Sequence, residues 1–238
     1  MIFGAVLAGG IGTRMHMADM PKQFLPLGDR PIIIHTLEKF LLCSRFSKVY
    51  VGVHRDWMEY MRSLVAKYIP QCAGHIEIVA GGEDRNSTIL NIVEEIEATY
   101  GENDENIIVT HDSVRPFVSL RMIEDNIDAA IAYGAVDTVT AAVDTIVVSK
   151  DGTLISDIPQ RSNMYQGQTP QSFRISLLKT LYQSLSQEEK RVLTDACRIC
   201  VVRDYPVHMV EGSTTNLKIT TPGDYRIAQA MVGGEKID

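Results

Sequence analysis

A group of residues near the start of the chain has the composition of a phosphate-binding loop. Residues 7–14 read LAGGIGTR, so three glycines follow an apolar run and lead to Arg14, with Lys22 a little further on. Glycines directly after a strand let the backbone approach a ligand and present N–H groups to phosphate oxygens. Attack on a nucleotide α-phosphate builds negative charge on the phosphoryl oxygens and on the departing pyrophosphate, which an arginine fork and a lysine can stabilise. The loop therefore predicts a nucleotidyl-transfer site.

A dinucleotide-binding turn is the main alternative for this loop, and the sequence departs from it in two ways. The spacing that begins at Gly10 requires a further glycine where the chain has Met15. The acidic residue expected at the end of the second strand is also absent, and no Walker lysine motif follows. These differences disfavour a nicotinamide-dependent dehydrogenase. The presence of Arg14 and Lys22 disfavours a regulatory nucleotide-binding protein that has lost its chemistry.

Two further polar segments are expected at the ends of strands. Residues 81–88, GGEDRNST, open a helix whose free backbone N–H groups could bind a base or a phosphate. Residues 111–116, HDSVRP, follow an almost wholly apolar run. Here Asp112 could bind Mg²⁺ and Arg115 an acceptor phosphate, while His111 is expected to be a hydrogen-bonded structural histidine. Because ligands of open α/β sheets bind beyond the carboxyl ends of strands, all three segments should converge on one crevice.

The elements that must position these segments follow a regular alternation. Apolar runs typical of buried strands alternate with segments whose apolar residues recur at helical spacing, and Asp84 can cap the third helix. This rhythm predicts an α/β fold with a doubly wound, mostly parallel, Rossmann-like sheet of the nucleotidyltransferase type. The expected strands are residues 2–7, 49–53, 76–79 and 107–109, and the expected helices are residues 31–42, 57–69, 84 onward and 122–133.

The alternation stops after residue 136. Residues 138–148 are rich in Val, Thr and Ile, residues 150–152 (KDG) form a hairpin-type turn, and residues 153–158 are predicted to pair back. We therefore expect a projecting β-arm in this region, on a single domain of residues 1–238. The remaining elements expected are helices at 172–185, 187–197 and 222–231, and an extended segment at 207–210.

Composition limits the partners. The formal net charge is −7, from 23 Lys and Arg against 30 Asp and Glu, which disfavours nucleic acid or an anionic membrane surface. A polyanionic ligand would need a few cations concentrated at its site. The N-terminus resembles neither a signal peptide nor a membrane span, so a cytoplasmic protein is expected. The pair Cys197 and Cys200 lacks a second pair of zinc ligands, and the four cysteines are expected to be reduced core thiols.

Taken together, these motifs resemble the cytidylyltransferase family, whose best-known members make CDP-ribitol and CDP-methylerythritol. The similarity covers the glycine loop with Arg14, the Pro-Lys-Gln at residues 21–23, and the segments at 81–88 and 111–116. It continues through residues 169–171 (TPQ), 194–195 (TD) and 216–220 (NLKIT), and so extends over essentially the full chain.

The resemblance implies a role for each matching residue. Arg14, Lys22, Arg161 and Lys218 would be catalytic, and Asp112 would place Mg²⁺. Arg115, Thr145, Arg161 and Lys218 would bind the acceptor phosphate. The arm, which the resemblance places at about residues 144–171, would embrace a second subunit, giving a homodimer in which Arg161 serves the neighbouring active site. The residues implied to bind CTP are Leu7, Ala8, Gly9, Gly10, Gly82, Glu83, Asp84, Arg85, Asn86, Ser87, Thr88 and Ser113.

The acceptor is the remaining question. Residues 111–117, 142–147 and 165–171 resemble the ribitol-5-phosphate branch more than the methylerythritol branch, in which small alanines usually stand at the positions of Ser113 and Val114. We therefore expect CMP transfer from CTP to ribitol-5-phosphate, giving CDP-ribitol and pyrophosphate for cell-wall polymers of the teichoic acid type. The alternative is the methylerythritol-phosphate cytidylyltransferase of isoprenoid synthesis. Neither reaction needs a catalytic base, because a phosphate monoester, with a second pKa of about 6, is already largely ionised near neutral pH.

Overall fold

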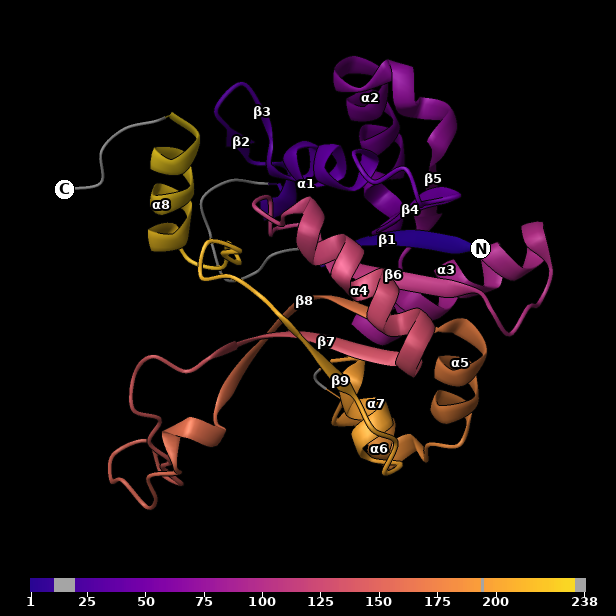
Figure 1. The fold of residues 1–238 in the computed structure, drawn as a ribbon. Coiled ribbons are helices and arrows are strands. Elements are labelled where there is room, and N and C mark those ends of the chain that lie inside the picture. Colours follow the sequence, from indigo (N-terminus) through magenta and orange to yellow (C-terminus); the bar gives the residue numbers. More distant parts are fainter. Residues whose placement is uncertain (11–19, 194, 234–238) are drawn as a thin grey trace.

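The computed structural model describes residues 1–10, 20–193 and 195–233, which form a central twisted sheet with helices on both faces (Figure 1). Among these residues the main sheet has seven strands in the order β5-β4-β1-β6-β8-β7-β9. The strands are β1 (Ile2–Ala8), β2 (Pro26–Leu27), β3 (Arg30–Pro31), β4 (Lys48–Val53), β5 (Ile76–Ala80), β6 (Ile107–Asp112), β7 (Ala135–Ala141), β8 (Tyr165–Arg174) and β9 (His208–Glu211). The α-helices are α1 (Ile32–Leu41), α2 (Met58–Tyr68), α3 (Arg85–Tyr100), α4 (Leu120–Tyr133), α5 (Ile175–Gln183), α6 (Gln187–Arg191), α7 (Cys197–Val201) and α8 (Pro222–Gly233).

The parallel centre of the sheet confirms the predicted fold class. Strand β1 pairs in parallel with β4 on one side and with β6 on the other, and β4 pairs in parallel with β5. Every residue of β6 is buried, as expected for a strand covered on both faces. Because the chain leaves β1 toward β4 and later returns to β6 on the other side, the carboxyl end of β1 is a point where the strand order reverses, which is where α/β sheets bind ligands.

Two hydrophobic layers enclose this sheet. Side chains of α1, α2 and α4 pack on one face, with Ile33, Phe40 and Ile123 each fully buried. Side chains of α3, α5 and α7 pack on the other face, around the fully buried Phe3 and Phe173. The strand ends that carry the polar segments are therefore held between two rigid layers.

Strand β8 is the largest departure from the prediction. Residues 172–174, expected to begin a helix, complete a ten-residue strand, and α5 starts only at Ile175. This strand runs antiparallel to both of its neighbours, β6 and β7. Its sequence, YQGQTPQSFR, has little apolar alternation because its buried part contains Thr169, Gln171 and Ser172, whose side chains form hydrogen bonds.

The arm also differs from the prediction. Strand β7 ends at Ala141, and residues 142–164 project away from the sheet with one isolated bridge, between Val148 and Asp157, in place of the two paired strands expected at 138–148 and 153–158 (Figure 1). The predicted turn is present, since Gly152 has φ +77° and Asp151 Oδ1 accepts hydrogen bonds from Thr153 N and Leu154 N. The turn forms from local contacts, whereas the arm has too few neighbours to complete a ladder.

The C-terminal third contains smaller differences. The helix expected at 187–197 is replaced by the short helices α6 and α7. The extended segment at 207–210 is β9, which lies parallel to β7, and the terminal helix is α8, as predicted. A third apolar cluster joins α8 to β2 and to the end of β6 through Ile219, Tyr225 and Val114. This cluster brings the loop between β9 and α8, which carries Lys218, to the carboxyl edge of the sheet.

Candidate active site

A single cavity brings together the three polar segments that the sequence singles out. It has a volume of about 570 Å³ and lies beyond the ends of β1 and β6, beside the start of α3 and the loop before α8. Its place at the carboxyl edge of the sheet agrees with the expected crevice. It is lined by Leu7, Ala8, Gly9, Gly10, Lys22, Gln23, Gly82, Glu83, Asp84, Arg85, Thr88, Asp112, Ser113, Val114, Lys218 and Thr220.

The glycine loop is held in place by a side chain that the sequence analysis did not assign. Gln23, which is buried, donates both N–H bonds of its amide to carbonyl groups, at 2.8 Å to Ala8 O and 3.1 Å to Gly10 O. With these carbonyls bound to Gln23, the loop is fixed at the point where it enters the cavity. In the motif Pro-Lys-Gln, the lysine is the residue with an expected catalytic role. The glutamine that follows it bonds the glycine loop and so holds Lys22 close to that loop.

The start of α3 forms the second wall. Asp84 caps the helix as predicted, accepting from Ser87 N at 2.7 Å, while the Ser87 hydroxyl donates back to Asp84. Thr88 is buried, and its hydroxyl accepts from Gly82 N at 3.0 Å and donates to Asp84 O at 2.8 Å. A Cβ on Gly9 would lie 3.1 Å from that hydroxyl. Thr88 therefore packs the start of α3 closely against the glycine loop. A residue larger than glycine at position 9 would push these two segments apart.

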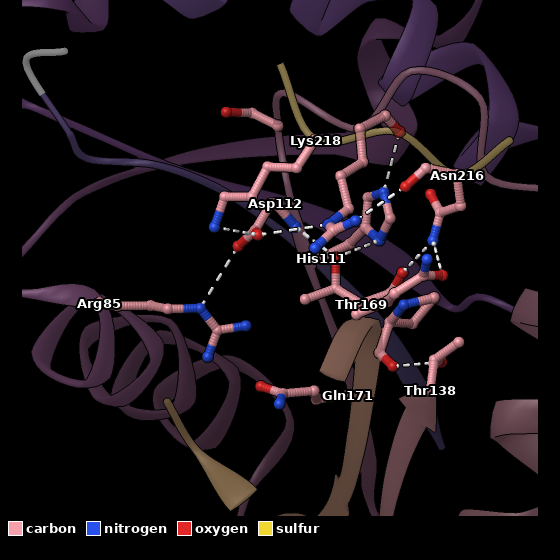
Figure 2. Close-up of polar contacts among 12 residues, drawn as sticks. Arg85, His111, Asp112, Thr138, Thr169, Gln171, Asn216 and Lys218 are labelled. Atoms are coloured by element: carbon pink, nitrogen blue, oxygen red, sulfur yellow. Dashed lines mark hydrogen bonds and ion pairs between the residues drawn. The ribbon is translucent and has the colours of Figure 1, made fainter. Parts of the chain in front are cut away.

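Asp112 lies at the centre of a cluster of positive charges (Figure 2). Its carboxylate is 2.8 Å from Lys218 Nζ, 3.4 Å from Arg85 Nε and 3.6 Å from Arg115 Nε. Burial alone would raise the pKa of Asp112, but the charges of Arg85, Lys218 and Arg115 outweigh burial and hold the pKa well below its usual range. One ionised carboxylate thus faces three cations, so this protein of net charge −7 concentrates positive charge at the cavity, as a polyanionic ligand requires.

His111 is the buried structural histidine that the sequence predicts. Its Nε2 lies 3.1 Å from Arg115 O and its Nδ1 lies 2.9 Å from Thr169 Oγ1. Because a carbonyl oxygen can only accept, Nε2 carries the proton, and Nδ1 accepts from the Thr169 hydroxyl. That hydroxyl in turn accepts from Asp112 N at 3.2 Å. Burial lowers the pKa of His111 to about 4, so the ring is neutral near pH 7 and holds the end of β6 in place.

Among the predicted site residues that the structure describes, most line the cavity, and the exceptions fall into three groups. Arg115 is buried behind Asp112, with Nη1 donating to Asn216 O at 2.7 Å. Asn86 and Ser87 lie in the first turn of α3 outside the lining, and Arg14 lies outside the described residues. Thr145 and Arg161 are exposed on the arm, where Arg161 Nη1 donates to Val143 O at 3.1 Å. Within one chain, the arm residues therefore do not join the cavity.

Three lining residues were missed by the sequence analysis: Gln23, Val114 and Thr220. Gln23 directly follows Lys22, and Thr220 lies two residues after Lys218. Their closeness to these two lysines is the sequence signal that could have identified them. Val114 was noted as a difference between family branches without being placed at the site. Its position on the cavity wall makes it a candidate determinant of acceptor shape.

Two observations limit what else the chain contains. Within residues 1–10, 20–193 and 195–233, no three His, Cys, Asp or Glu side chains gather into a group that could hold a metal ion by itself. In that same part of the chain, no helix has both the length and the apolar character needed to cross a membrane. The acidic residues Glu83, Asp84 and Asp112 line the cavity.

Asp137 gives a pH-dependent prediction next to the site. Its Oδ1 accepts from Gln171 Nε2 at 3.0 Å, and burial raises its pKa to about 6. The folded protein therefore holds this proton more tightly than the unfolded chain, so the contribution of Asp137 to stability is present below about pH 4 and is lost as the pH rises through 6. We expect Asp137→Asn to raise the free energy of unfolding by about 2 kcal/mol at pH 7.5 and by little near pH 4.

Denaturant titrations of both proteins at the two pH values test this expectation. The same stability difference at both values would show that the carboxyl does not titrate in this range. Because only the difference between variant and wild type is used, other titrating groups largely cancel.

Comparison with known proteins agrees with this geometry. A family model described as IspD: 2-C-methyl-D-erythritol 4-phosphate cytidylyltransferase matches residues 2–234. The 4-diphosphocytidyl-2C-methyl-D-erythritol synthase of Anaerococcus prevotii is 24% identical, with a TM-score of 0.78 and 98% of each chain covered. The 2-C-methyl-D-erythritol 4-phosphate cytidylyltransferase of Francisella tularensis is 26% identical, with a TM-score of 0.77, covering 95% of this chain and 97% of that one. That of Thermus thermophilus is 24% identical, with a TM-score of 0.74, covering 98% and 100%.

Proposed function

We propose a reaction for this chain, which belongs to the 2-C-methyl-D-erythritol 4-phosphate cytidylyltransferase family. It joins CMP from CTP to the phosphate of a short sugar alcohol and releases pyrophosphate. Cytidylyltransferase activity itself follows from the family. The observation that carries the proposal is the meeting of the glycine loop, Lys22, Asp112 and Lys218 at one cavity. That arrangement suits a triphosphate on one side and an acceptor phosphate on the other.

CTP is proposed to lie between the glycine loop and the start of α3. The loop offers backbone N–H groups to the phosphates, and Lys22 offers a cation for the charge that develops on them. Gly82 and Thr88 close the wall where the base would lie. Arg14, which adjoins the same loop in the sequence, is proposed as a second cation.

The acceptor phosphate is proposed to bind the cations around Asp112. Lys218 lines the cavity and Arg115 supports it from behind, so the bound phosphate would replace part of their pairing with the carboxylate. The reaction is in-line attack of an ionised phosphate oxygen on the α-phosphate, with pyrophosphate leaving. Positioning and charge stabilisation suffice, and no side chain has to remove a proton.

A divalent cation, Mg²⁺, fits the donor set. The ionised carboxylate of Asp112 is a hard oxygen ligand, and Mg²⁺ commonly takes one or two carboxylates together with phosphate oxygens and water. When bound, the ion would neutralise charge on the triphosphate. The residues around it would keep the same tasks, with Lys22 near the triphosphate and Lys218 near the acceptor.

A homodimer is proposed as the working unit. The most exposed large apolar side chains of the arm are Val143, Leu154, Ile155 and Ile158, with between 57% and 74% of each accessible. A projecting segment with this much exposed apolar surface is typical of one that packs against another subunit. A second copy would also place Arg161 and Thr145 where their implied roles require them, at the neighbouring cavity. As a CTP-dependent enzyme of this family, the protein is proposed to work in the cytoplasm.

Two acceptors are candidates. The family description and the solved relatives name 2-C-methyl-D-erythritol 4-phosphate, which makes it the first candidate. Ribitol-5-phosphate is the second, because Ser113 and Val114, the two positions that resemble the ribitol branch, both line the cavity. With ribitol-5-phosphate the product would be CDP-ribitol, an intermediate for polymers of the teichoic acid type.

Pyrophosphate release with CTP and Mg²⁺ tests the proposal, with the two acceptors compared in parallel. Release with methylerythritol phosphate alone would establish the first candidate, and release with ribitol-5-phosphate alone the second. In either case we expect kcat/KM for the preferred acceptor to exceed that for the other by about 10²-fold or more, because the two differ in hydrogen-bonding groups. Silence with both would contradict the proposed acceptor class.

A further inference from the structure

Lys218 lies on a loop that has no regular structure of its own. Residues 212–221, between β9 and α8, form neither helix nor strand. A lysine on such a loop has many conformations, and its ammonium group would spend little time at any one place unless the backbone were fixed. One anchor follows Lys218 directly: Ile219 is fully buried and its N–H donates to Val114 O at 2.9 Å.

The second anchor is Asn216, two residues before Lys218 (Figure 2). Its side chain is fully buried, and Nδ2 donates to Thr169 O at 2.8 Å and to Gln168 Oε1 at 3.1 Å. On the opposite side, its backbone oxygen accepts from Arg115 Nη1 at 2.7 Å. One residue thus joins the Lys218 loop to β8 and to the segment after β6, both of which border the charge cluster.

Among the residues that the structure describes, the amide group of Asn216 has two directional contacts and one atom without a partner. Within the described part of the chain, Asn216 Oδ1 is buried without a hydrogen-bond partner. A buried acceptor without a partner is costly, but an apolar side chain of similar size would carry a cost of its own, because it would leave Thr169 O without this donor. What an apolar side chain could not do is donate to two acceptors on β8. The directional contacts of the amide are therefore the feature that distinguishes asparagine here.

We propose that Asn216 is a positioning residue for the acceptor phosphate. Its amide holds the loop so that Lys218 and Arg115 converge on one point beside Asp112, although Asn216 lines no part of the cavity itself. This inference rests on the proposed function, in which those cations receive the acceptor. It adds that their geometry is set by a side chain which touches neither substrate.

Steady-state kinetics of Asn216→Ala test the inference. The expected result is an increase of about 10-fold or more in KM for the acceptor, with KM for CTP within about twofold of wild type, because the glycine loop and α3 are not attached to Asn216. A loss of packing alone would change neither KM selectively. An acceptor KM within twofold of wild type would overturn the proposal.

Asn106→Ala is the matched control. Asn106 is also buried and also uses its amide group, accepting from the N-terminal ammonium of Met1 at 2.9 Å, but it lies at the opposite end of β6. The Asn106→Ala variant should be less stable than wild type, and its KM for the acceptor should not change selectively. If Asn216→Ala does not fold, Gln168→Ala removes one of the two acceptors of the same amide and should raise acceptor KM by about threefold. An unchanged KM in that variant would count equally against the proposal.

Binding of inorganic phosphate separates failure of this inference from failure of the proposed function. If wild type turns over neither acceptor, the proposed function is wrong, yet the cation cluster can still be titrated with phosphate by calorimetry. We then expect Asn216→Ala to bind phosphate about fivefold or more weakly than wild type and Asn106→Ala to bind it equally. Equal binding by wild type and Asn216→Ala would overturn the positioning role.

Discussion

Replacing Lys22 with alanine should lower kcat by about 10²- to 10³-fold, the loss typical of removing one group that stabilises transition-state charge. Lys22 lines the cavity beside the glycine loop, on the side proposed for the triphosphate. Its charge would matter most when pyrophosphate separates from the α-phosphate, because negative charge on the leaving group is then greatest. The loss should therefore appear mainly in kcat, with a smaller change in KM for CTP.

The fold should survive this substitution. The turn that carries Lys22 is held by its neighbours, since Gln23 bonds the glycine loop and Phe24 packs against Trp57 and Tyr60. Lys39→Ala, on the exposed face of α1, is the matched control, because it removes the same charge away from the cavity. Single-turnover assays of both variants, with thermal melts, make the comparison. Turnover of Lys22→Ala equal to that of Lys39→Ala would rule out the catalytic role.

The sequence predicts the convergence of the site better than its internal contacts. The glycine loop, the start of α3 and the end of β6 are each preceded by an apolar strand, and the rule that such strand ends share one edge places them together. Asp84 is recognisable as a cap because its partner Ser87 is three residues away. Signals of this kind are local, or follow from a periodic pattern, and both can be read from a single chain.

The contacts that position the cations leave no such pattern. Gln23 bonds Ala8 across 15 residues, and Asn216 bonds Thr169 across 47. A hydrogen bond between distant segments depends on the final fold and adds no periodicity to the sequence. Strand β8 was predicted wrongly for a related reason, because its buried polar residues hide the alternation by which half-buried strands are recognised. Gln23 and Asn216 were thus missed because each acts by bonding another segment of the chain.

Arg161 supplies the second large effect, and mixing of inactive subunits should reveal it. Arg161→Ala alone should lower kcat/KM by about 10²-fold or more, because the proposed acceptor site would lose a charged partner. In its own chain Arg161 is exposed on the arm and donates to Val143 O, and it does not line the cavity. If it serves the partner's site, a heterodimer of Arg161→Ala with Lys22→Ala has one site that lacks both groups and one that lacks neither.

With free subunit exchange, half of the dimers formed from an equal mixture are heterodimers, and each has one intact site of two. Mixing two almost inactive proteins should therefore restore about a quarter of wild-type activity per site. If Arg161 acted within its own chain, every site in the mixture would lack one group and activity would stay near zero. Two affinity tags, one on each variant, allow the heterodimer to be isolated, so exchange is demonstrated in the same sample. An inactive, purified heterodimer would contradict a site shared between subunits.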